Sequence, residues 1–409
     1  MTAAGDARQV LAASLADALA RLDPARVVYE ALPEAPARSG RVIVIAAGKA
    51  AAAMAKGAFA RWPDRIDAAL VVTVAPHLDP LEIDARGRAV VRAAAHPIPD
   101  ERSVAAADDA LARASALGPE DLLLALISGG ASALLAAPPA GMALAEKQAA
   151  VAALLERGVS IRDVNLVRRH LSRIKGGRLA RAAAPAETAT LIASDVIGGA
   201  PHDIGSGPTT PDPTTLADAR AVLERASLPL PAWLDESLKP GEPVHTSARI
   251  LVDPATLGHA VGDALARHGL RVIVDAPDEG DAPAVVDRRL ARAAQLAPGE
   301  AVVIPCEPTI TLPPARGQGG RAGWIALAAL RRLPPDVALL CAASDGVDGS
   351  SGAAGAIVTR ADADHIDGAA IDAALAGHDD ASVHRALGTH LAGGPTGHNL
   401  ADVHVLVRW

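Results

Sequence analysis

The chain has 409 residues, of which 50% are apolar, and 39 Lys and Arg against 47 Asp and Glu leave a formal net charge of −8. This length predicts two or three domains with ample material for their cores. The negative balance argues against nucleic acid or an anionic membrane as the main partner. Four Trp, one Tyr and one Phe are too few for a base-stacking surface.

Cysteine usage and the apolar pattern predict a cytoplasmic protein. Cys306 and Cys341 are the only cysteines, which excludes a disulfide framework and favours a reducing compartment. Residues 1–10 lack the basic start and apolar run of a signal peptide. No stretch approaches 18 consecutive apolar residues, so we expect no transmembrane helix.

The first part of the chain alternates between helical and strand patterns. In chain order the patterns predict a helix over 7–31, a strand over 41–47, a helix over 50–61, a strand over 70–74, a helix over 103–117, a strand over 122–127, helices over 143–157 and 161–183, and a strand over 190–193. Such alternation implies a parallel sheet with helices on both faces.

Residues 228–247 are rich in proline and turn residues, which predicts a domain boundary. A second alternating run follows, with strands over 248–252, 271–275, 301–304, 337–342 and 403–407 and helices over 255–268, 284–297 and 322–332. We therefore predict two α/β/α domains with mainly parallel sheets, residues 1–235 and 246–409, the first of them Rossmann-like.

Two predicted strands run into loops of small residues. The first ends in Gly48 and Lys49, and the second in Ser128, Gly129, Gly130, Ala131 and Ser132. In open α/β sheets ligands bind at this edge, and bare backbone amides suit phosphate groups. The alternative is an ordinary strand-to-helix turn that needs glycine for a positive φ.

A third loop follows the strand that ends near residue 193. It contains Asp195, Gly198 and the pair Ser206 and Gly207. Asp195 could hold Mg²⁺ or orient a hydroxyl group, whereas the alternative is a helix cap. His202 and Asp203 lack a third ligand at a standard spacing, which argues against a resident metal centre.

Charged residues recur in three other segments. Arg173 and Lys175 could bind a carboxylate or phosphate, or lie on a solvated helix face. Arg321 ends a glycine-rich loop over 316–321, which suits recognition of planar anions. Asp345 and Asp348 precede glycines, so turn chemistry alone could explain them.

These segments together resemble the glycerate 2-kinase family, whose C-terminal half is called the MOFRL domain and whose members are often labelled hydroxypyruvate reductase. The resemblance runs through most of the chain. Its most specific parts are Ala47-Gly48-Lys49-Ala50, Ser128-Gly129-Gly130-Ala131-Ser132, the run from Val164 to Gly177 and the loop from Ser194 to Thr209.

The resemblance implies two α/β domains on either side of an active-site cleft, and ATP with Mg²⁺ as the phosphoryl donor to the 2-hydroxyl group of D-glycerate. Lys49 matches the cleft lysine of the family and Arg321 the arginine of its glycine-rich loop. With Asp195 these are the expected catalytic residues, and Asp195 is also the expected metal ligand. The small-residue loops would bind the nucleotide phosphates, and Arg173, Lys175, Asp345 and Asp348 the substrate.

The C-terminal half departs from the family pattern. Ala322-Gly323-Trp324 stands where Asn-Gln-Glu is usual, Gly352 replaces an aspartate, and His398 replaces a threonine. These changes remove polar groups beside Arg321 and leave the exact hydroxy acid open.

Two other functions stay open. One is an NAD(P)H-dependent hydroxypyruvate reductase, although Gly317-x-Gly319-x-x-Ala322 is a weak dinucleotide fingerprint. The other is a binding protein that has lost catalysis. In either case the expected partner is a small molecule, and a homodimer is left open.

Overall fold

The computed structural model describes residues 3–36, 39–74 and 80–409. Two compact units make up the chain. One, the N-terminal unit, is Pro24–Leu251. The other, the C-terminal unit, joins Met1–Asp23 to Val252–Trp409.

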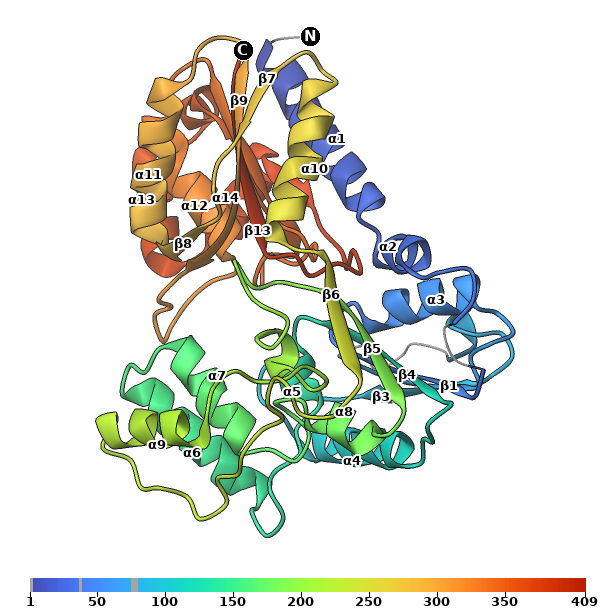
Figure 1. Ribbon diagram of the computed structural model, residues 1–409. Helices are drawn as coiled ribbons and strands as arrows, with labels where there is room; N and C mark the ends of the chain where they lie inside the picture. The colour runs from blue at the N-terminus through green and yellow to red at the C-terminus, as the bar shows by residue number, and fades with distance from the viewer. Residues whose placement is uncertain (1–2, 37–38, 75–79) are drawn as a thin grey trace. The chain divides into compact units, whose positions relative to one another are not determined.

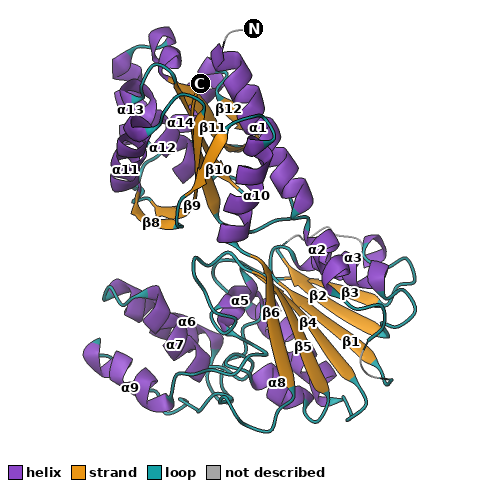
Figure 2. Ribbon diagram, turned by 45° about the horizontal axis from the view of Figure 1, so that its top comes forward, coloured by secondary structure: helices purple, strands orange, loops and turns teal. Residues whose placement is uncertain are grey.

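The N-terminal unit is built on a six-stranded sheet in the order β3-β2-β1-β4-β5-β6 (Figure 2). Its strands are β1 (Val42–Ala47), β2 (Ala68–Thr73), β3 (Ala89–Ala93), β4 (Leu122–Ser128), β5 (Glu187–Ala193) and β6 (Thr246–Val252). Neighbouring strands from β3 to β5 pair in parallel. This is the strand order of doubly wound nucleotide-binding folds, in which β1 and β4 flank the point where the winding reverses.

The apolar strands β1 and β4 are buried along their whole length, as is typical of a sheet covered on both faces. The covering and connecting helices are α2 (Pro24–Ala31), α3 (Ala51–Arg61), α4 (Glu101–Ser115), α5 (Ala131–Leu134), α6 (Leu144–Glu156), α7 (Ile161–His170), α8 (Arg178–Ala183) and α9 (Leu216–Arg225). In Figure 1, α2 and α3 lie on one face of this sheet and α4 and α8 on the other. Helices α6, α7 and α9 share a smaller apolar cluster of their own.

The C-terminal unit has a mixed sheet in the order β12-β11-β10-β13-β9-β7, with β8 also paired to β9. Its strands are β7 (Arg271–Val274), β8 (Asp278–Asp281), β9 (Glu300–Thr309), β10 (Val337–Ala343), β11 (Ala353–Thr359), β12 (His390–Ala392) and β13 (Asp402–Arg408). Only β7 and β8 among them run parallel to β9. The other pairings are antiparallel.

Helices cover both faces of this second sheet. They are α1 (Ala3–Arg21), α10 (Pro254–Ala266), α11 (Ala282–Gln295), α12 (Arg321–Ala329), α13 (Gly368–Gly377) and α14 (Asp380–Leu387). Figure 1 shows α1 beside α10 on one face, and α11, α12 and α13 on the other. No helix in the described parts of the chain is long and apolar enough to cross a membrane.

The predicted α/β fold class is confirmed, but the prediction of mainly parallel sheets is wrong for the second unit. The link from β10 to β11 spans only residues 344–352. Parallel neighbours need a crossover of about a dozen residues or more, so this short link forces an antiparallel pair.

Three predicted elements also differ from the structure. The helix over 7–31 is two helices, because Pro24 cannot continue the first. The helix over 161–183 is two helices, α7 and α8, separated by residues 171–177, and Gly176 and Gly177 adopt positive φ just before α8 begins. The strand over 248–252 is β6 and belongs to the first sheet, while α1 belongs to the C-terminal unit, so the boundaries differ from 1–235 and 246–409.

Candidate active site

The loops after β1 and β4 meet at the point where the sheet's winding reverses. Register pairs Ala47 with Ile127, which places the two loops side by side. The backbone N–H of Lys49 donates to the carbonyl of Gly129 at 2.9 Å, and that of Ala50 donates to Ser128 Oγ at 3.0 Å. Lys49 is therefore held at the start of α3 by two bonds to the neighbouring loop.

Gly48 is required by this close approach. Its φ is +131°, and a Cβ at this position would lie 2.0 Å from Ser128 Oγ. Any side chain would force the two loops apart. The glycine thus sets the position of Lys49, because it lets the β1 backbone pass against Ser128.

The loop after β5 joins the same site through two hydroxyl groups. Ser206 Oγ lies 3.0 Å from Ser132 Oγ, and both belong to predicted phosphate-binding segments. Gly205, Ser206 and Gly207 all have φ near +60°, which for the non-glycine Ser206 is an uncommon conformation. Ser206 is 1% exposed. The surrounding packing therefore holds this serine in place.

Lys175 is a positioning residue of this site rather than a surface cation. Its side chain is 1% exposed. Its Nζ donates to the carbonyl of Ser132 at 2.7 Å, to Ser132 Oγ at 3.1 Å and to the carbonyl of Leu135 at 3.1 Å. All three ammonium protons are used, so Lys175 fixes the turn of α5, and burial lowers its pKa well below the usual value.

Arg173 lies in a different environment. Its Nε donates to the carbonyl of Pro138 at 2.8 Å, and NH2 pairs with Asp108 of α4 at 2.7 Å. It lines a cavity of about 440 Å³ together with the segment from Pro138 to Leu144. Neither of these two bonds goes to Lys49 or to the loops after β1, β4 and β5.

Asp195 follows β5 at the same sheet edge. Ala193 is paired with Ser128, so the carboxylate belongs to the segment beside the β4 loop. Gly198 is exposed, with open space around it and a φ of +61°. Among the described residues no group of three metal-ligating side chains occurs. A nucleotide-bound Mg²⁺ needs only one or two carboxylates besides phosphates and water, so Asp195 alone fits that requirement.

The C-terminal unit positions Arg321 at the first residue of α12. Its Nε donates to Asp402 Oδ2 at 2.6 Å and NH2 to Asp402 Oδ1 at 3.0 Å. NH1 donates to the carbonyl of Pro308 at 3.2 Å and lies 3.6 Å from Glu307 Oε1. Burial acts to lower the pKa of Arg321, but the charge of Asp402 more than reverses this, so the guanidinium stays protonated.

Asp348 caps α12 from the loop after β10. Its Oδ1 accepts from the N–H of Ala322 at 3.0 Å and its Oδ2 from that of Gly323 at 2.8 Å. Burial raises its pKa to about 6. Burial and the nearby Asp348 raise the pKa of Asp380, at the start of α14, to about 7. The structure therefore uses Asp348 to position the helix that carries Arg321.

The glycine-rich loop before Arg321 packs against carboxylates. A Cβ on Gly319 would lie 1.9 Å from Asp380 Oδ1, and one on Gly320 would lie 2.2 Å from Asp348 Oδ1. One on Gly317 would lie 2.4 Å from the Cβ of Asp379. Contact with these three aspartates accounts for glycine at all three positions.

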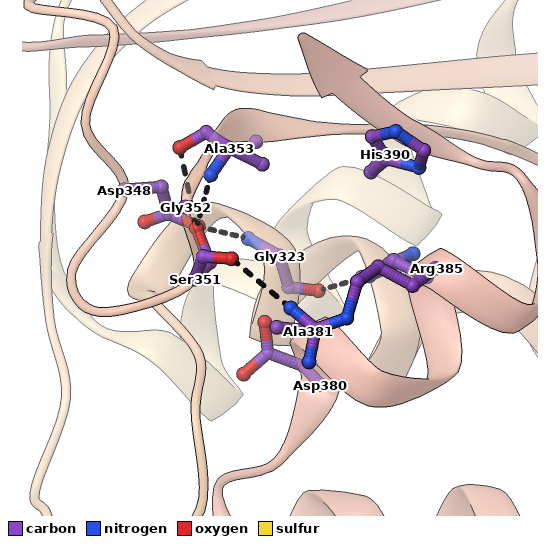
Figure 3. A pocket seen from close by; sticks show the side chains of 11 residues that line it. Gly323, Asp348, Ser351, Gly352, Ala353, Asp380, Ala381, Arg385 and His390 are labelled. Carbon is purple, nitrogen blue, oxygen red and sulfur yellow. Dashed lines mark hydrogen bonds between the residues drawn. The ribbon is translucent and has the colours of Figure 1, made fainter. Parts of the chain in front are cut away.

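The positions that depart from the family pattern have distinct environments. Ala322 is buried, and Trp324 donates its indole N–H to the carbonyl of Leu375 at 3.0 Å. Gly323 lines a cavity of about 260 Å³ with Asp348, Asp380, Arg385 and His390 (Figure 3). A Cβ on Gly323 would lie 2.3 Å from Asp380 Oδ2, so glycine here makes room for that carboxyl group.

Asp345 has a local role. Its Oδ1 accepts from the N–H of Val347 at 3.0 Å, and its backbone carbonyl accepts from Thr396 at 3.1 Å. This is the turn chemistry that the sequence offered as the alternative. Sequence reasoning missed Asp402, Asp380 and Glu307; the first two lie 81 and 60 residues along the chain from the positions they contact. The pairing of β13 with β9, which brings Asp402 to Cys306, has no local sequence signal.

Comparison with known proteins gives a family for this arrangement. Residues 10–239 match the domain described as "Domain of unknown function (DUF4147)", and residues 300–402 match the MOFRL family. The chain is 39% identical to a protein of Agrobacterium vitis provisionally named hydroxypyruvate reductase, over 98% of this chain and 94% of that protein. It is 33% identical to D-glycerate 2-kinase of Thermotoga maritima over 93% of each.

The fold of this chain is similar to that of a glycerate kinase from Thermotoga maritima in its crystal structure, with a TM-score of 0.89. The two sequences are 29% identical, and the match covers 99% of this chain and all of the other. Fold and sequence thus define a two-unit α/β protein of the class that combines a DUF4147 domain with a MOFRL domain. The chain belongs to the glycerate 2-kinase family, and the resemblance inferred from its motifs is confirmed.

Proposed function

We propose that this protein transfers the γ-phosphoryl group of ATP to the 2-hydroxyl group of D-glycerate or of a closely related small hydroxy acid. The observation that carries the proposal is the joining of three loops, after β1, β4 and β5, around Lys49 at the reversal point of the first sheet. Phosphoryl transfer depends on positioning and on charge neutralisation more than on covalent chemistry, and this edge provides both.

The proposal assigns roles to residues of both units, as the resemblance to glycerate 2-kinases implies. In the N-terminal unit, the amides and hydroxyls of residues 128–132 and 206–207 bind the nucleotide phosphates, and Lys49 neutralises the charge that moves with the phosphoryl group. In the C-terminal unit, Arg321 binds the substrate carboxylate or the transferring group. Asp195 would hold the Mg²⁺ that accompanies ATP, and that ion would add further positive charge beside the phosphates.

The reductase alternative has weaker support. Glycines 317 and 319 of the partial dinucleotide fingerprint pack against Asp379 and Asp380, which explains them without a nucleotide. The turn after β1 reads Ala47-Gly48-Lys49-Ala50, without the three glycines of a pyrophosphate-binding turn. We therefore place the proposed kinase first, as a cytoplasmic enzyme of small-molecule metabolism.

The test is the release of ADP from ATP and Mg²⁺ in the presence of single acceptors. The panel contains D-glycerate, L-glycerate, tartronate, hydroxypyruvate, erythronate and threonate. Release that requires D-glycerate supports the proposal as stated, and release with another acid makes the altered segment after Arg321 the specificity determinant. No release with any acid contradicts the kinase, and oxidation of NADH or NADPH by hydroxypyruvate would then support the reductase.

The same assay tests Asp195. In Asp195→Asn the activity should require a higher Mg²⁺ concentration, because one anionic ligand is lost. Asp203→Asn is the control from the same loop, since Asp203 accepts a local bond from the N–H of Ala200 at 3.0 Å. An unchanged magnesium titration in Asp195→Asn would remove Asp195 from the proposed ligands.

A further inference from the structure

His96 lies beside Lys49, although the sequence places it in a different loop. It follows β3 by three residues. A Cβ on Gly130 would lie 3.2 Å from Cδ2 and 3.4 Å from Nε2 of His96, and 3.6 Å from Cγ of Lys49. The imidazole and the lysine side chain therefore lie against the same turn after β4.

The hydrogen bonding of this imidazole differs from that of the buried His170 and His384. His170 has both ring nitrogens within 3.2 Å of an acceptor, and both ring nitrogens of His384 lie within 2.9 Å of a polar atom. His96 is exposed, and across the described residues its ring nitrogens have no hydrogen-bond partner. A ring in this state can accept a proton from a bound ligand and pass it to water.

The charges around His96 favour the neutral ring. Partial burial against the turn and the charge of Lys49 both lower its pKa. Asp100 follows in the same loop, but its carboxylate accepts from the N–H groups of Arg102 and Ser103 at the start of α4. Of the described charged groups, Lys49 alone affects the pKa of His96. The ring is therefore unprotonated near neutral pH and has a free lone pair.

We propose that His96 is the general base that removes the proton from the attacking hydroxyl group of the hydroxy acid. This inference rests on the proposed kinase function. Lys49 is expected to contact the transferring phosphoryl group, so a base beside Lys49 lies close to the reacting atoms.

The step balances in atoms and charge. The hydroxyl oxygen forms a bond to the γ-phosphorus, and the bond between that phosphorus and the β–γ bridging oxygen breaks. The hydroxyl proton moves to a ring nitrogen of His96 and then to solvent, while ADP keeps the bridging oxygen. The exposed position of His96 lets the imidazolium release its proton after each turnover.

The experiment compares ADP release with D-glycerate in the wild type, His96→Gln and His96→Ala across pH 5 to 9. His268→Ala is the matched control, because His268 is an exposed histidine just past the end of α10. Thermal unfolding of each variant reports whether the fold is kept. For the wild type, kcat/KM should fall as the pH drops through the lowered pKa of His96.

In both His96 variants we expect kcat to fall by about 100-fold near pH 8, with the KM for ATP unchanged, and the acid limb of the pH profile to disappear. A wild-type kcat and pH profile in His96→Gln would overturn the assignment of His96 and leave the kinase intact. A rise in the KM for the acid at unchanged kcat would also overturn it, since it would make His96 a binding contact. If the wild type releases no ADP with any acid, the proposed function fails and this inference fails with it.

Discussion

The guanidinium of Arg321 and the carboxylate of Asp402 form a two-bond ion pair, with N–O distances of 2.6 and 3.0 Å. Arg321 begins α12 and Asp402 begins β13, so the pair ties the helix to the central part of the second sheet. Asp402 is 1% exposed, whereas Arg321 keeps about a third of its side chain accessible. The aspartate therefore fixes one edge of a guanidinium whose remaining surface can meet a ligand.

Replacing Asp402 by Asn should lower kcat by about tenfold, because Arg321 loses its nearest counter-charge and its fixed orientation. The variant should also unfold at a lower temperature, since the partly buried guanidinium then keeps only Glu307, at 3.6 Å, as a counter-charge. Steady-state kinetics and thermal unfolding measure the two effects. The matched control is Asp372→Asn, which breaks an exposed pair with Arg331 and should change stability by less than about 1 kcal/mol. If Asp402→Asn and Asp372→Asn changed kcat and the unfolding temperature equally, the proposed role of Asp402 in orienting Arg321 would be contradicted.

Lys49→Ala should reduce kcat/KM by at least about tenfold without altering the thermal unfolding temperature. The physical reason is that Lys49 is held by its backbone, so its side chain can be removed without breaking the two loop bonds. Lys56→Ala is the control in α3, the helix that follows Lys49, because the Lys56 side chain is 42% exposed and its Nζ lies 3.9 Å from Glu82 Oε2. Wild-type turnover in Lys49→Ala would show that Lys49 is not a catalytic residue.

Ser132→Ala should lower both stability and activity. The change removes the bond to Ser206 Oγ and one of the three acceptors of Lys175, and a buried ammonium that loses an acceptor costs about 1–3 kcal/mol. We expect a lower unfolding temperature and a higher KM for ATP. Ser115→Ala, at the exposed end of α4, should leave both quantities unchanged. A stable variant with normal KM would show that the hydroxyl network does not position the loops.

The buried carboxyl groups of the C-terminal unit predict how stability varies with pH. An unfolded aspartate ionises near pH 4, whereas the pKa of Asp348 is raised to about 6 and that of Asp380 to about 7. The folded state therefore binds protons that the unfolded state has released, and stability falls as pH rises from about 4 to 7. Asp380→Asn removes one of these groups, so its unfolding temperature should exceed that of the wild type at pH 8.

At pH 4 the Asp380→Asn variant and the wild type should unfold at similar temperatures, because the native aspartate is then protonated and resembles the amide. Asp364→Asn is the control, since Asp364 is 74% exposed and should show no such pH-dependent difference. If Asp380→Asn were equally more stable than the wild type at pH 4 and at pH 8, the raised pKa of Asp380 would be contradicted.

The sequence predicts four strands of the first sheet, β1, β2, β4 and β5, because each is a local apolar run, but it misses β3 and assigns β6 to the second unit. Strands such as Val42–Ala47 are continuous apolar runs, and glycines such as Gly48 mark their ends. Parallel pairing brings those ends to one edge, so the strand pattern by itself is enough to group the loops after β1, β4 and β5. The glycine-rich loop before Arg321 predicted an anion-binding residue there, and the family resemblance made Arg321 a catalytic candidate.

The second sheet is harder to predict, because its neighbours are distant in sequence. Strand β13 lies between β9 and β10, and nothing within residues 402–408 specifies either partner. The role of Asp402 depends on that pairing, and the rise in the pKa of Asp380 depends on burial beside Asp348. His96 was missed for a similar reason, since only the three-dimensional path after β3 brings it to Lys49.

The membership of α1 in the C-terminal unit makes the N-terminal unit an insertion within the other. During synthesis, residues 24–251 can fold as one continuous segment, whereas α1 must wait until α10 and the central strands of its own sheet have been made. The first helix is therefore exposed for most of translation. A shortened protein that begins at residue 252 would leave uncovered the surface of α10, β10 and β11 that α1 contacts, and it should aggregate when produced alone.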